Sequence, residues 1–95
     1  MIVITSTYTA PLEEVANHRD AHIAFLAGLS DAGHIIAFGR ANPPTGGVVL
    51  ATGWTADEAR AAFAEDPYVV AGISEYAYVE FSPAFVEPGL ERLKD

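Results

Sequence analysis

The spacing of the apolar residues changes several times along this chain, and the order of those changes restricts the fold more than any other feature. Residues 1–8 begin with an apolar, β-branched run that predicts a strand. From residue 11 to residue 32 the apolar positions, among them Val15, Leu26 and Leu29, recur at helical spacing. Gly33 follows as a stop signal. The first third of the chain is therefore predicted to be a strand and one long amphipathic helix.

The remaining pattern predicts a hairpin, a second helix and a last strand. Two apolar runs, residues 35–39 and 48–52, flank a turn-forming Asn-Pro-Pro-Thr-Gly-Gly segment. Thr55 and Glu58 form a capping-box pattern before a second helix, and residues 76–81 alternate as a strand does. The predicted class is α+β with the ferredoxin-like order β-α-β-β-α-β, a four-stranded antiparallel sheet with two helices on one face.

The other face of such a sheet has no cover within one chain. Because a chain of 95 residues has a thin core, we expect a homodimer, or a higher homo-oligomer, that pairs through this face. We expect residues 1–82 to form the domain and residues 83–95 to form a tail. The tail carries the apolar residues Phe85, Val86, Leu90 and Leu93, and we expect it to pack on a neighbouring subunit.

Charge and composition exclude several classes of partner. Thirteen acidic and five basic residues give a net charge of −8, which disfavours binding to nucleic acid. The absence of cysteine excludes disulfides, thiolate metal sites and a cysteine nucleophile. There is neither a signal-like N-terminus nor an apolar run long enough to span a bilayer, so we expect no membrane contact and a cytoplasmic protein.

Two residues stand out as candidates for chemistry. His22 lies on the apolar stripe of the first predicted helix, where it is either a core histidine bonded to a carbonyl or a general acid or base near neutral pH. Asp66 precedes Pro67, a pattern typical of an N-cap, and its carboxylate can also orient an imidazole. From spacing alone, the structural explanations are the stronger ones.

A set of ordered fragments changes that balance. Arg-Asp-Ala-His-Ile-Ala-Phe-Leu at residues 19–26, Phe-Gly at 38–39 and Asp-Pro-Tyr-Val-Val-Ala-Gly at 66–72 resemble the pattern of the YciI-like, or YCII-related, family over about residues 1–82. The resemblance implies a dimeric ferredoxin-like subunit with a cleft that contains His22 and Asp66. Related dimeric barrels include isomerases, lyases and cofactor-free oxygenases that act on small molecules.

We therefore expect an isomerase or lyase without a cofactor, in which His22, oriented by Asp66, transfers a proton on a small carbonyl, lactone or phenolic compound. Arg19, Arg40 and Tyr68 are the expected substrate-binding residues. Arg40 departs from the family pattern, because a proline or small residue often stands there. The alternative is a non-catalytic dimeric module that binds a small molecule or serves in assembly.

A metal centre is the weakest of the hypotheses. His18 and His22 lie four residues apart, and Glu14 lies four before His18, a spacing at which two histidines can share a metal ion. The sequence offers no glutamate directly after the first histidine and no evident distant ligand. We therefore expect no metal site.

Overall fold

The computed structural model describes residues 1–94, and within them the chain follows the predicted order of strands and main helices. The strands are Ile2–Tyr8 (β1), Ile35–Arg40 (β2), Gly47–Ala51 (β3) and Ser74–Glu80 (β4). They form one antiparallel sheet in the order β2-β3-β1-β4. The helices are Leu12–Ala16 (α1), Arg19–Asp31 (α2), Ala56–Phe63 (α3) and Pro67–Val70 (α4), followed by a 3-10 helix, Glu91–Lys94 (η1). The ferredoxin-like α+β prediction is confirmed.

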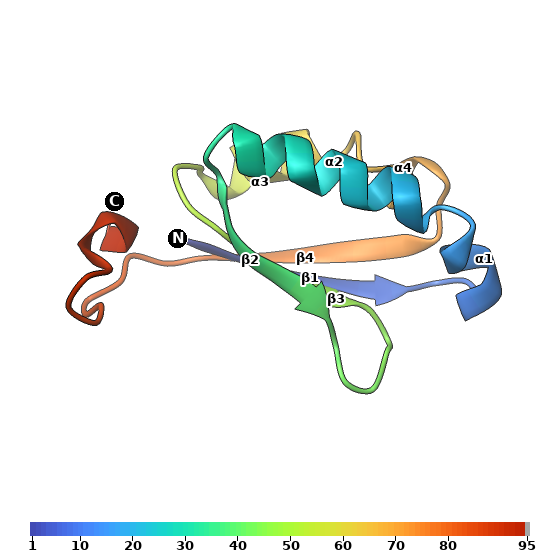
Figure 1. Ribbon diagram of the computed structural model, residues 1–95, viewed down its shortest axis with the longest axis horizontal. Helices are drawn as coiled ribbons and strands as arrows, with labels where there is room; N and C mark the ends of the chain where they lie inside the picture. The colour runs from blue at the N-terminus through green and yellow to red at the C-terminus, as the bar shows by residue number, and fades with distance from the viewer. Residues whose placement is uncertain (95) are drawn as a thin grey trace.

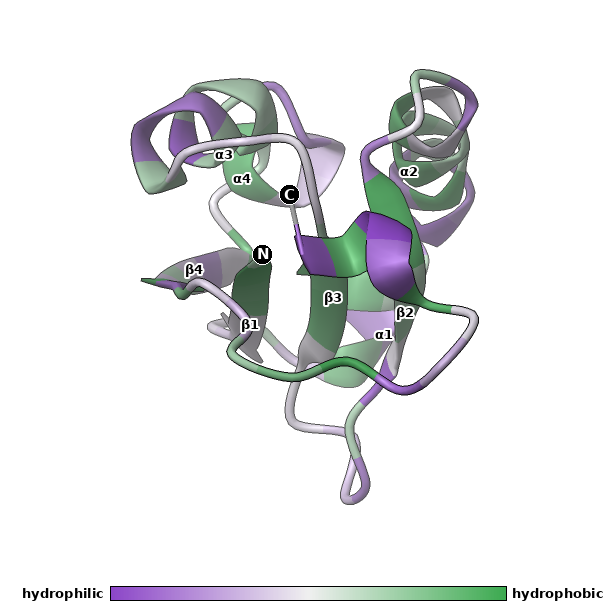
Figure 2. Ribbon diagram, turned by 90° about the vertical axis from the view of Figure 1, so that its left-hand side faces the viewer, coloured by the Kyte–Doolittle hydropathy of each residue, from purple (hydrophilic) through white to green (hydrophobic). Residues whose placement is uncertain are grey.

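The two main helices lie on the same face of the sheet. Figures 1 and 2 show α2 over the β2 side and α3 with α4 over the β4 side, as their contacts with those strands also indicate. The core lies between the layers, where the alternate residues Ile2 and Ile4 of β1 meet Leu26 and Phe63 from the helices. The pocket described below lies between α2 and the sheet.

The prediction of a single long helix over residues 11–32 is wrong, because Asn17 and His18 interrupt the helix and separate α1 from α2. Asparagine is a poor helix former whose side chain competes for backbone hydrogen bonds. The backbone of His18, at φ −109° and ψ 2°, is no longer α-helical. The break lets Val15 pack in a separate small cluster with Tyr68, away from the core position of Leu26.

The capping box predicted at the start of α3 is confirmed. The Thr55 amide donates to Glu58 Oε1 at 2.9 Å, and the Glu58 amide donates to Thr55 Oγ1 at 3.2 Å. The next free amide, that of Ala56, donates to Glu80 Oε1 of β4 at 2.7 Å. The same helix end is therefore tied to the sheet as well as to itself.

Within residues 1–94, no helix covers the second face of the sheet (Figure 1). It exposes apolar side chains, of which Val79 is 60% exposed and Val48 is 38% exposed. Residues 83–94 run away from the domain past the N-terminus, with Phe85 79% exposed and Leu93 buried (Figure 1). None of the helices within residues 1–94 combines the length and the apolar character needed to cross a bilayer.

Candidate active site

Asp66 enters the site through its role as a helix cap. It is the N-cap of α4, where its Oδ1 accepts a hydrogen bond from the Tyr68 amide at 3.0 Å and Pro67 occupies the first turn. The side chain is fully buried. The cap predicted from the Asp-Pro sequence is thus present, and it fixes the carboxylate in the interior beside α2.

His22 approaches that carboxylate from the side of α2 that faces α4. Its Nδ1 lies 2.9 Å from Asp66 Oδ1 and 3.0 Å from Oδ2. Because an ionised carboxylate can only accept, Nδ1 carries the proton and Nε2 is the basic nitrogen of the ring. The two structural explanations for these residues, a core histidine bonded to a carbonyl and an isolated cap, therefore do not describe the pair.

Tyr76 completes the set of donors to Asp66. Its hydroxyl, on the helix-facing side of β4, donates to Asp66 Oδ2. Burial first, and then this hydrogen bond to Asp66, raise the pKa of Tyr76 far above its ordinary value. Sequence reasoning placed Tyr76 on the right strand but did not connect it with Asp66, since strand alternation indicates a face and not a partner.

The Nε2 atom of His22 opens to a pocket. Within residues 1–94, Nε2 makes no hydrogen bond, and no buried side-chain nitrogen or oxygen lacks a partner. Nε2 is therefore accessible, although the His22 side chain as a whole is only 15% exposed. A basic nitrogen at the edge of a cavity is the arrangement that proton transfer to a bound molecule requires.

Tyr68 holds the imidazole ring in place. The rings of His22 and Tyr68 stack at 3.9 Å between centroids and 7° between planes, and Tyr8 meets Tyr68 edge-on at 6.1 Å. Burial, with a smaller contribution from Tyr8, raises the pKa of Tyr68, whereas Arg19 and Arg40 act in the opposite direction. The hydroxyl of Tyr68 therefore stays protonated at neutral pH, and Tyr68 lines the same pocket as both arginines.

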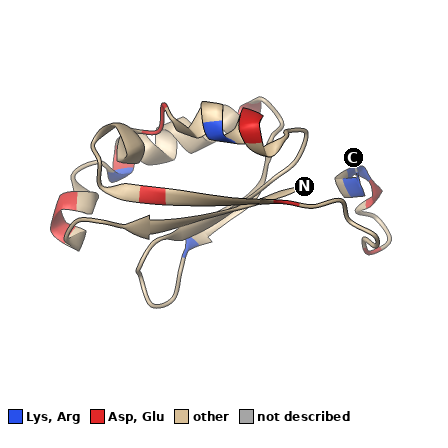
Figure 3. Cartoon of the chain, turned by 180° about the vertical axis from the view of Figure 1, so that it is seen from behind, with Lys and Arg blue, Asp and Glu red and all other residues tan. Residues whose placement is uncertain are grey.

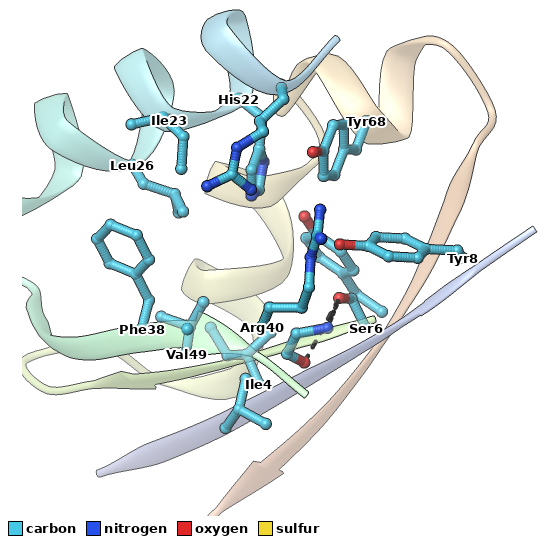
Figure 4. Close-up of a pocket in the computed structure, with 15 residues that line it drawn as sticks. Ile4, Ser6, Tyr8, His22, Ile23, Leu26, Phe38, Arg40, Val49 and Tyr68 are labelled. Carbon is cyan, nitrogen blue, oxygen red and sulfur yellow. Dashed lines mark hydrogen bonds between the residues drawn. The ribbon is translucent and has the colours of Figure 1, made fainter. Parts of the chain in front are cut away.

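The pocket lies between α2 and the sheet and has a volume of about 110 Å³. Four of the five residues proposed from the sequence line it, namely His22, Arg19, Arg40 and Tyr68, and the fifth, Asp66, is bonded to His22. Figure 4 shows the hydroxyls of Tyr8 and Tyr68 and the guanidinium of Arg40 pointing toward a common space. Sequence analysis missed Ser6 and Ile23 as lining residues, because only the register of β1 with β3 and the position of α2 bring them there.

The two arginines at the pocket have no acidic partner within residues 1–94. The ion pairs in that part of the chain are His22 with Asp66 and Arg60 with Asp57. Figure 3 shows acidic positions at the α1 end of the long axis, and both acidic and basic positions at the tail end. Arg19 and Arg40 thus make the pocket a basic spot on a protein whose net charge is −8.

The residues considered for a metal site do not gather around a centre. Across residues 1–94 no group of three or more histidine and acidic side chains is arranged to hold a metal ion. His18 is the N-cap residue of α2 and is absent from the pocket wall. The helix break described above places Glu14 on a different helix from His22.

Comparisons with known proteins agree with this fold. The sequence model of the YCII-related domain family matches residues 1–82. Six solved chains match in structure. One is 5-chloro-2-hydroxyhydroquinone dehydrochlorinase from Burkholderia phenoliruptrix AC1100, in complex with 2,5-dihydroxybenzoquinone, with a TM-score of 0.70 at 19% identity over 85% of this chain and 93% of that one. No curated protein matches in sequence.

Proposed function

Because this chain belongs to the YCII-related domain family, we propose that it is a cofactor-independent enzyme in which His22 transfers protons on a small carbonyl, lactone or phenolic compound. One observation carries the proposal. The Nδ1 atom of His22 is bound to the buried carboxylate of Asp66, while Nε2 faces a pocket lined by cations and hydroxyls. The proposed reaction type is isomerisation or elimination.

The chemical step begins at Nε2. This nitrogen accepts a proton from a carbon next to a carbonyl group, and the electron pair of the broken C–H bond moves to form an enolate. Asp66 stabilises the imidazolium that results and keeps its orientation. In an isomerisation the imidazolium returns the proton to a different carbon. In an elimination the electron pair instead expels the leaving group, which departs as an anion.

Arg19, Arg40 and Tyr68 are the proposed partners of the substrate oxygen. Negative charge gathers on that oxygen as the enolate forms, and donors already in place for it lower the barrier. The raised pKa of Tyr68 keeps its hydroxyl available as a donor at neutral pH. The two guanidinium groups have no acidic side chain within residues 1–94 to neutralise them first.

The structural neighbour supports this class of chemistry. That protein is named as a dehydrochlorinase of a hydroxylated ring and holds a dihydroxybenzoquinone, so it acts on a small ring that carries oxygen atoms. Loss of hydrogen chloride is an elimination, one of the two reaction types proposed here.

Deuterium exchange tests the proposal without knowledge of the natural substrate. The protein is incubated in D2O with a panel of small cyclic ketones, lactones and phenols, and proton NMR follows the loss of carbon-bound hydrogen. We expect enzyme-dependent exchange with at least one class, abolished in His22→Gln. His18→Gln is the matched control, because it changes a histidine one turn away that is not in the pocket wall. Binding without exchange would favour a non-catalytic module instead.

We also propose that the working form is a homodimer joined through the open face of the sheet. Val79 and Val48 are exposed there, although they are apolar residues on regular strands. Burying such a face against a second copy removes it from water. The exposed Phe85 of the tail is proposed to pack on that neighbour in the same way.

A further inference from the structure

The pocket has two chemically different ends. Figure 4 shows Phe38, Ile23 and Leu26 gathered on one side, and Tyr68, Tyr8 and Arg40 on the other. His22 lines the same cavity, so a bound molecule in contact with its Nε2 has both ends within reach. A ligand that fits this wall has matching polar and apolar ends.

Phe38 is the most exposed of the apolar lining residues. Its partner across the sheet is Val49, a core residue on the helix-facing side, so Phe38 points to the same side. Phe38 nevertheless remains 44% exposed, whereas Leu26 beside it is buried. An apolar group placed against the Phe38 ring would therefore remove apolar surface from water.

The polar end carries more hydrogen-bond donors than the protein itself uses. Arg19 and Arg40 have no acidic partner within residues 1–94, and Tyr68, whose hydroxyl is protonated, lines the pocket with them. Ser6 differs, since its Oγ already accepts from the Gly47 amide at 2.8 Å. The free donors are cationic or neutral, which selects an anionic acceptor.

The volume of the pocket limits what fits between the ends. A cavity of roughly 150 Å³ in another protein takes up one benzene molecule. The volume here is about 110 Å³, and the pocket opens to solvent, so its enclosed part suits a single six-membered ring whose small substituents reach the opening.

From these three observations we infer that the pocket selects a single-ring molecule with an ionised oxygen substituent at one end and a small apolar substituent, such as a methyl group or a halogen, opposite it. The inference rests on the pocket used in the proposed function and specifies its substrate class. It concerns binding, so it can be tested apart from turnover.

Four probes separate the two ends. 4-Methylbenzoate has both required features, benzoate lacks the apolar substituent, 4-hydroxybenzoate replaces it with a polar one, and 4-methylbenzamide lacks the charge. We expect 4-methylbenzoate to bind about fourfold more tightly than benzoate, the effect of burying one methyl group. We expect it to bind about fivefold more tightly than the neutral amide. Calorimetry or shifts in the His22 ring signals measure the affinities.

Two variants assign each preference to its end. Phe38→Ala should abolish the preference for the methyl group and keep the preference for the anion, whereas Arg40→Gln should do the reverse. Both positions are exposed, so the variants are expected to fold, and an amide NMR spectrum checks this. If the affinities of the four probes do not differ, or if each variant lowers all of them equally, the inference is overturned.

The same data keep the two proposals apart. The affinity pattern without deuterium exchange on any compound would leave the substrate class standing and overturn the proposed catalysis. Deuterium exchange, together with equal affinities for all four probes, would support the proposed catalysis and overturn the substrate class.

Discussion

The Asp66 carboxylate has two roles. One of its oxygens caps α4, and both oxygens face the His22 ring. The hydroxyl of Tyr76, on β4, donates a hydrogen bond to the second oxygen. A fully buried carboxylate needs such hydrogen-bond donors, because burying a charge without hydrogen bonds is costly in free energy. The catalytic candidate and the stability of the helix end therefore depend on the same few atoms.

Tyr76→Phe tests that dependence. The change removes one hydrogen bond to a charged, buried group, and we expect it to lower the free energy of unfolding by about 1.5–3 kcal/mol. Tyr78→Phe is the control, because Tyr78 lies on the same face of β4 and its hydroxyl makes no hydrogen bond within residues 1–94. Urea unfolding measures both. Equal effects of the two changes would contradict this account of Tyr76.

Asp66→Asn separates the cap from the proposed base–orienter pair. An asparagine oxygen can still accept from the Tyr68 amide, but the neutral side chain no longer stabilises an imidazolium at His22. We expect the proposed exchange reaction to slow by up to about 10⁴-fold, as for an orienting aspartate elsewhere. The exchange assay in D2O measures the rate. A variant that is folded and exchanges at the original rate would show that Asp66 is only a cap.

At the level of elements, the loop between β2 and β3 joins the strand ends that carry Arg40 and Gly47, both of which line the pocket. It is held against β1 by the Tyr8 amide, which donates to the Thr45 carbonyl at 2.8 Å, and by the Gly47 amide, which donates to Ser6 Oγ. A Cβ at Gly46 would lie 1.8 Å from the Ser6 carbonyl oxygen. Only glycine allows the loop to come this close to the strand.

A pair of glycine substitutions with opposite signs follows. Gly46→Ala forces backbone atoms apart, and we expect a loss of about 1–3 kcal/mol in the free energy of unfolding. Gly28→Ala, within α2, has nothing within 4 Å of the added Cβ, and we expect a gain of about 1 kcal/mol from helix propensity. Urea unfolding of the two variants checks both signs. A Gly46→Ala protein as stable as the parent would mean that the loop moves freely.

At the scale of the whole molecule, the one-sided layering explains why a second subunit is proposed. The helices bury one face of the sheet, and the other face shows Val79 and Val48 to solvent. The pocket residues His22, Arg19 and Tyr68 lie on helices, so pairing through the open face leaves them accessible.

Val79→Lys is the test of that assembly. A charge buried in an interface without a partner is costly, so we expect light scattering coupled to size exclusion to show a dimer for the parent and a monomer for this variant. Val70→Lys is the matched control, because Val70 is 74% exposed on α4, on the helix side. A monomeric parent protein at micromolar concentration would contradict the proposed dimer.

Local signals in the sequence determined the strands, the hairpin, the Asp66 cap and the capping box at Thr55, because strand alternation and caps involve residues a few positions apart. The sequence pattern did not predict the helix break at Asn17, since the apolar helical stripe continues through the site of the break. His22 and Asp66 lie 44 residues apart, so local spacing could not pair them, and only the family pattern did.

Tertiary structure alone decided what surrounds that pair. Tyr76 meets Asp66 from ten residues away, and His22 meets it from 44 away. Such contacts depend on the packing of α2 and α4 over the sheet, and no local spacing records how layers pack. The residue types were present in the sequence. Their arrangement, with one imidazole nitrogen bound to a buried carboxylate and the other open to a pocket of two unlike ends, came from the fold.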